Sequence, residues 1–117
     1  MKTVTLYRPV GPKELALIRD SGWKAFPPRL PEQPIFYPVT NEDYAIQIAR
    51  DWNVKASGSG FVTRFEVDAD YAAQFPKRIV GTRVHEELWV PADELSVFNS
   101  KIVGKIKVTH EFPIKTA

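Results

Sequence analysis

The placement of proline constrains this sequence more than any other feature. Five of its ten prolines lie in residues 26–38. Proline fixes φ and has no backbone N–H, so neither a long helix nor a central strand can run through such a stretch. We therefore predict an extended, stiff loop between two folded flanks, with Tyr37 among the side chains available to line a pocket.

Length and charge restrict the class of protein. The 117 residues predict one domain spanning residues 1–117, and a net charge of +2 gives no strong nucleic-acid signal. The absence of cysteine excludes disulfides and a thiolate nucleophile. No apolar run is long enough for a membrane span, so we expect a cytoplasmic location and no membrane partner.

Two helices flank the proline-rich loop in the predicted organisation. A β-rich opening segment ends near Arg8, where Pro9 is expected to close the strand. Residues 11–22 predict a helix, with Pro12 in its first turn and Gly22 after its end. Leu15, Leu17 and Ile18 would form its buried stripe. Residues 40–52 predict a second helix, capped by Thr40 or Asn41, whose apolar side is Ala45, Ile46, Ile48, Ala49 and Trp52.

The second half of the sequence is dominated by strand patterns. A Gly/Ser-rich connection at residues 57–60 is expected to be mobile, and residues 61–67 alternate in the manner of a strand. Residues 78–84 and 87–90 are strand candidates with a bulge at Gly81, a short helix starts at Pro91, and residues 102–112 form the last strand. On that strand Ile102, Ile106, Val108 and Phe112 would share one side. The order predicts an α+β fold with a mixed or antiparallel split sheet and two main helices.

The segment from His85 to Pro91 is the most informative candidate site. On a regular strand, His85, Glu87 and Trp89 share one face, and an aromatic wall beside Glu87 would raise the pKa of its carboxyl group. The alternative interpretation is a solvated strand edge kept soluble by its acidic residues. A zinc-protease motif is excluded because no histidine follows four residues after His85, and we expect no metal.

Three further residues are candidates for ligand binding. Arg8, at the end of the first strand, has the planar fork that grips a phosphate, although it could equally be a surface arginine. Tyr37 could stack on a planar ligand or anchor the proline-rich loop. Tyr7 is either a ligand-binding or a core aromatic residue.

Two family resemblances bear on these residues. The segment from Glu87-Leu88-Trp89-Val90-Pro91 to Ile102–Val108 resembles the last part of the ADP-ribosyltransferase fold, in which a glutamate directly precedes an apolar strand. Leu6-Tyr7-Arg8 and the helix after it resemble the opening strand and helix of that family. The whole chain also resembles small bacterial proteins labelled "ADP-ribosylation/crystallin J1". The segment that carries this second resemblance is residues 26–39.

The resemblance implies a compact NAD-binding domain that transfers ADP-ribose from NAD to an acceptor. It implies that Arg8 holds the pyrophosphate, with Tyr7 beside it, and that Tyr37 stacks near the nicotinamide ring. Glu87 would orient the ribose hydroxyl and stabilise developing positive charge, with His85 on the acceptor side. The alternative is a binding or protein-interaction module that kept this fold without turnover, since no Ser-Thr-Ser strand is present and His85 stands where the arginine-modifying branch has Glu or Gln.

Overall fold

Three long antiparallel strands form the centre of the computed structural model, which describes residues 2–79 and 85–113. The strands are β1 (Thr3–Val10), β2 (Ile35–Phe36), β3 (Gly60–Asp68), β4 (Lys77–Ile79), β5 (Glu86–Leu88), β6 (Val90–Pro91) and β7 (Ile102–Phe112). The helices are α1 (Pro12–Asp20), α2 (Glu42–Ile48), the π-helical turn η1 (Ala49–Asn53), α3 (Val54–Ser57), α4 (Ala69–Ala72), the 3-10 turn η2 (Ala92–Glu94) and α5 (Leu95–Ser100).

The central sheet has the order β1-β3-β7 and is extended beyond β1 by remote segments. Val39 pairs with Tyr7 of β1 on one side and with Glu87 of β5 on the other. β5 pairs in turn with β4, and β2 pairs with β6. All of these pairings are antiparallel, so the predicted α+β class with antiparallel strands is confirmed.

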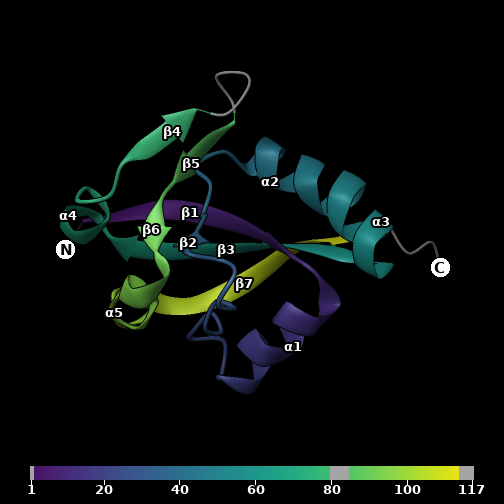
Figure 1. Cartoon of the computed structure of the whole chain (residues 1–117), viewed down its shortest axis with the longest axis horizontal. Coiled ribbons are helices and arrows are strands. Elements are labelled where there is room, and N and C mark those ends of the chain that lie inside the picture. The colour runs from purple at the N-terminus through teal and green to yellow at the C-terminus, as the bar shows by residue number, and fades with distance from the viewer. Residues whose placement is uncertain (1, 80–84, 114–117) are drawn as a thin grey trace.

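Helices cover both faces of this sheet, as Figure 1 shows with α2 and α3 on one side and α1 on the other. The larger core lies on the α1 side and contains the buried rings of Phe26, Phe36, Phe65 and Phe98. The smaller core lies under α2 and includes Val39, Ala45, Ala49, Val62 and Phe112. Each face of the sheet therefore has its own apolar layer, and successive residues of β1 belong to different layers.

Both main helices begin as their sequences predict. Pro12 opens α1 after Gly11, and the helix ends at Asp20 before Gly22, whose φ of +81° suits glycine. Asn41 caps α2, because its side-chain oxygen accepts a hydrogen bond from the Tyr44 N–H at 3.1 Å.

The first strand does not end at Arg8. β1 continues through Pro9, which is in register with Val62 of β3. The N–H and C=O of Tyr7 point to Val39, away from β3. Pro9 follows Tyr7 by two residues, so its nitrogen also faces away from β3. It lies beyond the isolated bridge between Tyr7 and Val39. Proline is tolerated there because its missing N–H is not required by the β3 ladder.

Trp52 is not on the buried side of its helix. Ala45 and Ala49 are fully buried, but 71% of Trp52 is exposed. The π-helical turn at Ala49–Asn53 inserts an extra residue and rotates the later side chains around the helix axis. The sequence pattern assumed an uninterrupted period of 3.6 residues, which this turn breaks.

Two other predicted apolar positions also face solvent. Leu17 of α1 is 48% exposed, while Ile18 is fully buried and Leu15 is packed against the core. Val108 of β7 is 40% exposed. The predicted shared side of β7 is also divided, with Ile106 in the larger core and Phe112 in the smaller one, because the pairing with β3 shifts register between them. Such irregularities change which residues face the core.

Gly60 ends the Gly/Ser-rich connection in a tightly packed position. A Cβ added there would lie 2.2 Å from the Ala49 carbonyl oxygen and 2.8 Å from the Asn53 Cβ. Glycine therefore allows β3 to approach the π-helical turn closely, a role distinct from the mobility that its sequence suggested. The predicted bulge at Gly81 lies outside the described residues.

Among the described residues, no helix has the length and apolar character needed to cross a lipid bilayer.

Candidate functional site

Glu87 lies within the sheet and not at its edge. Its backbone is in register with Val39 on one side and with Arg78 of β4 on the other. Since Val39 is also in register with Tyr7, the residues Tyr7, Val39 and Glu87 form a row across β1, the isolated bridge residue and β5. Their side chains share the sheet face that α2 covers. The interpretation of Glu87 as a solvated edge residue does not fit this position.

Two hydrogen bonds orient the Glu87 carboxylate. The Tyr44 hydroxyl donates to Oε2 at 2.7 Å, and the Trp89 Nε1–H donates to Oε1 at 3.2 Å. Tyr44 comes from the first turn of α2, which the Asn41 cap holds in place, and Trp89 follows Glu87 by two residues. One donor thus fixes each carboxylate oxygen from a different structural element.

The environment of Tyr44 strengthens its role as a donor. Burial, together with the hydrogen bond to Glu87 and the charge of that carboxylate, raises the pKa of the Tyr44 phenol well above its usual value. The phenol therefore stays protonated at any physiological pH. Glu87 has a permanent hydrogen-bond donor at one of its oxygens.

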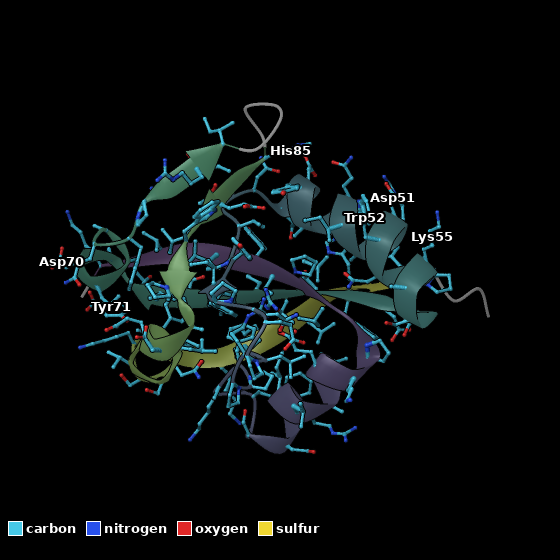
Figure 2. The ribbon with its side chains drawn as sticks, in the orientation of Figure 1. Asp51, Trp52, Lys55, Asp70, Tyr71 and His85 are labelled. Atoms are coloured by element: carbon cyan, nitrogen blue, oxygen red, sulfur yellow. The ribbon has the colours of Figure 1, made fainter. Side chains whose placement is uncertain are left out.

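His85 also contacts Tyr44, through its ring. The two rings stack with their centroids 4.4 Å apart and their planes at 24°. The His85 Nε2 is 3.1 Å from the Gln47 Oε1 of α2. Tyr44 therefore contacts both His85 and Glu87. Figure 2 shows His85 beside the first turn of α2.

Tyr37 joins the same cluster through Trp89. The two rings meet edge to face with a centroid distance of 5.6 Å, and the Arg78 guanidinium lies 5.4 Å from the Trp89 ring centroid. Tyr37 is half-buried. It stabilises one side of the aromatic wall that holds Glu87, and part of its surface stays accessible.

A groove of about 520 Å³ opens beside this cluster. It is lined by Tyr44, Gln47, Ile48, Trp52 and His85. The extra residue of the π-helical turn rotates the exposed Trp52 to the groove. In Figure 2, Trp52 lies toward the end of this helical segment and His85 lies near its beginning. We call the groove together with Glu87, Trp89 and Tyr37 the Glu87 face. Its aromatic walls suit a flat ring, and its carboxylate suits a hydroxyl donor or a developing positive charge.

Arg8 is not part of the Glu87 face. It follows Tyr7 directly and so points to the opposite side of the sheet. There its Nε and Nη2 donate to the two Glu14 carboxylate oxygens at 2.7 and 3.0 Å, and its guanidinium lies 4.7 Å from the Phe36 ring centroid. The structure thus brings together Tyr7, Tyr37, His85 and Glu87 on one face and places Arg8 on the other.

Glu86 also lies away from the Glu87 face. Its Oε1 accepts a hydrogen bond from the Thr40 hydroxyl at 2.9 Å, and its backbone carbonyl accepts one from the Thr40 N–H. The alternation predicted for residues 85–89 is therefore confirmed.

Sequence reasoning missed Tyr44, which contacts both His85 and Glu87. Its position three residues after the capping Asn41 was the available signal, because it puts Tyr44 in the first turn of α2. Among the residues that the structure describes, no three His, Asp or Glu side chains gather closely enough to hold a metal ion.

In comparisons with known proteins, the chain matches no protein-family model, no curated protein and no solved structure.

Proposed function

We propose that the Glu87 face binds NAD and transfers its ADP-ribose group to an acceptor, in an ADP-ribosyltransferase-like domain. The observation that carries the proposal is the Glu87 carboxylate, held at both oxygens by Tyr44 and Trp89 beside an aromatic groove. The resemblance of the segment after Glu87 to the end of the ADP-ribosyltransferase fold supports it.

The proposed chemistry is a substitution at the sugar carbon that bears nicotinamide. The bond from this carbon to the nicotinamide nitrogen breaks, and the nitrogen keeps the electron pair. A bond from the acceptor to the same carbon then forms, and the acceptor loses a proton to a base. The transition state resembles an oxocarbenium ion, which an adjacent carboxylate stabilises electrostatically. Glu87 has this role and also accepts a hydrogen bond from the ribose.

The aromatic side chains would position the flat parts of NAD. Tyr37 and the stacked pair of Tyr44 and His85 offer ring surfaces on either side of Glu87. His85, at the open groove, lies where an acceptor can approach and lose its proton. The expected grip of Arg8 on the pyrophosphate is not carried into this proposal, because Arg8 faces the other side of the sheet and is paired with Glu14.

The variant Glu87→Gln tests the proposal. It preserves the shape and removes the charge, so NAD cleavage should fall by about a hundredfold or more while NAD affinity changes little. The rate is followed by release of nicotinamide, and affinity by calorimetric titration. Glu86→Gln is the matched control, because the same chemical change falls on the opposite face and should leave cleavage nearly unchanged. Equal losses in the two variants, or full cleavage by Glu87→Gln, would contradict the role of Glu87.

The second candidate is a non-enzymatic binding or protein-interaction module that kept the fold without turnover. The observation that favours it is the Arg8–Glu14 pair, which occupies the arginine that the family resemblance assigns to NAD. Thermal unfolding with and without NAD separates the cases. NAD at a hundredfold excess over its dissociation constant should add about 2.7 kcal/mol of stability to the transferase, which also releases nicotinamide. No thermal shift at millimolar NAD would argue against the transferase and favour the protein-interaction module.

A further inference from the structure

A second hollow lies on the face of the sheet opposite Glu87. It has a volume of about 410 Å³, within the range of small-molecule pockets. The end of β1, the first turn of α1 and the proline-rich loop form its walls. We call it the Arg29 pocket, after the loop arginine that lines it.

Positive charge dominates the Arg29 pocket. Arg8, Lys13 and Arg29 line it with a single carboxylate, that of Glu14, which leaves a net charge of +2. Glu14 is fully engaged, because both of its oxygens accept hydrogen bonds from Arg8. Within residues 2–79 and 85–113, no carboxylate forms an ion pair with Arg29.

Arg29 is held in place within this positively charged pocket. Its Nε–H donates to the Ile35 carbonyl oxygen at 3.1 Å, and two prolines directly precede it. Burial, and next the repulsion from Arg8, lower the pKa of the Arg29 guanidinium, although it remains a cation at neutral pH. An anion in the pocket would offset the repulsion from Arg8, and a guanidinium already bound to the Ile35 carbonyl would lose little entropy on binding it.

The walls of the pocket supply the other requirements of a ligand. Leu17, Leu30, Pro27 and Pro28 give it an apolar side. Asn53 lines it as well, and the buried Asn53 Oδ1 has no hydrogen-bond partner among the described residues. The pocket thus offers the Arg29 guanidinium, the exposed Lys13 ammonium and an apolar wall.

We propose that the Arg29 pocket is a binding site for a phosphate monoester, separate from the Glu87 face. A monoester carries a charge of about −1.5 to −2 at pH 7, which matches the surplus in the pocket. The planar fork of Arg29 suits phosphate oxygens, and the ester group lies against the proline and leucine side chains.

Calorimetric titration with inorganic phosphate and with phenyl phosphate tests this site. Phenyl phosphate should bind more tightly than inorganic phosphate, because its ring covers the apolar wall. Arg29→Gln should weaken phenyl phosphate binding by about tenfold or more, since charge-assisted hydrogen bonds are lost. Arg19→Gln is the matched control: Arg19 belongs to α1 and is exposed beside Asp20, so the same charge change should leave affinity unchanged.

Lys13→Gln provides a second variant at an exposed position, where folding is not at risk. It should weaken binding by a few-fold through the loss of one charge. The absence of phenyl phosphate binding at millimolar concentration, or equal weakening by Arg29→Gln and Arg19→Gln, would overturn the proposal.

The two sites are distinguished by adding NAD. Glu87→Gln should bind phenyl phosphate as the unaltered protein does, and NAD should not displace it. Displacement by NAD would overturn the claim of a separate site. Because the titrations with phosphate and phenyl phosphate alone contain no NAD, they can succeed or fail independently of the proposed transferase activity.

Discussion

At the scale of single residues, the candidate site depends on a hydroxyl group that the sequence did not reveal. His85, Glu87 and Trp89 could be placed on one face from strand alternation alone. Tyr44 could not, since its contact with Glu87 joins residues 43 positions apart. The choice between Tyr7 and Arg8 was also beyond the sequence, because it depends on which of them faces the same side as Glu87.

The tyrosine phenols lead to a prediction about alkaline pH. Folding raises the pKa of Tyr44, and that of Tyr71, whose hydroxyl donates to Glu94. Below the usual phenol pKa of about 10, both tyrosines are protonated in the folded and the unfolded chain. Above it the unfolded chain releases these protons while the folded chain keeps them, so the free energy of unfolding falls as pH rises.

Tyr44→Phe should reduce this alkaline loss of stability, since it removes one of the two ionising groups. Urea unfolding at a series of pH values from about 8 to 11 measures the slope. Tyr71→Phe should reduce the slope in the same way. An unchanged slope in both variants would show that other groups cause the alkaline loss.

At the scale of helices and strands, the sequence predicts those elements whose ends are set by nearby residues. The start of α1, the cap of α2 and the bounds of β7 were all predictable. The failures occur where the backbone departs from a regular period. Trp52 belongs to a π-helical turn, and a register shift in β7 puts Phe112 in a different core from Ile106. Neither irregularity has a local residue signature.

Gly60 provides a test of one such contact between elements. Gly60→Ala places a Cβ against the backbone of Ala49, so β3 and the π-helical turn must move apart. We expect a loss of about 2–4 kcal/mol in the free energy of unfolding, measured in urea.

Gly11→Ala is the control for this substitution. Its added Cβ would lie 3.5 Å from the Ser57 Oγ, an ordinary contact, and Gly11 has a φ of −83°. Its cost should stay within about 1 kcal/mol. A Gly60→Ala protein as stable as Gly11→Ala would mean that the contact is looser than described.

At the scale of the whole molecule, the proline-rich loop is tied to the last third of the chain. The Asn99 Oδ1 accepts a hydrogen bond from the Phe26 N–H at 2.9 Å, and the Asn99 Nδ2 donates to the Phe26 carbonyl at 3.0 Å. This pair of hydrogen bonds holds the beginning of the loop where the Phe26 ring enters the main core.

Asn99→Ala should therefore destabilise the whole domain. Both polar backbone groups of the buried Phe26 lose their partner, which costs about 2–6 kcal/mol at roughly 1–3 kcal/mol for each group. Unfolding should remain a single cooperative transition, followed by circular dichroism and by tryptophan fluorescence. Separate transitions by the two probes would show that the loop unfolds independently.

The sheet also shows why fold class was predictable and topology was not. The composition of strands and helices along the chain indicates α+β. The joining of β1 to β5 through Val39 depends on two isolated bridges between segments remote in sequence. Long-range pairings of this kind have no signature within a single strand.

The bridging position of Val39 determines when the sheet and the candidate site can be completed during synthesis. The ribosome releases a chain from its N-terminus, and β1, α1 and α2 emerge well before Glu87 and β7. Until then Val39 has a neighbour on one side only, and β3 lacks its second partner. The Glu87 carboxylate therefore joins an incomplete sheet, and the candidate site forms only once most of the chain has been synthesised. A nascent chain stalled before this segment should expose open strand edges and offer a binding surface to chaperones.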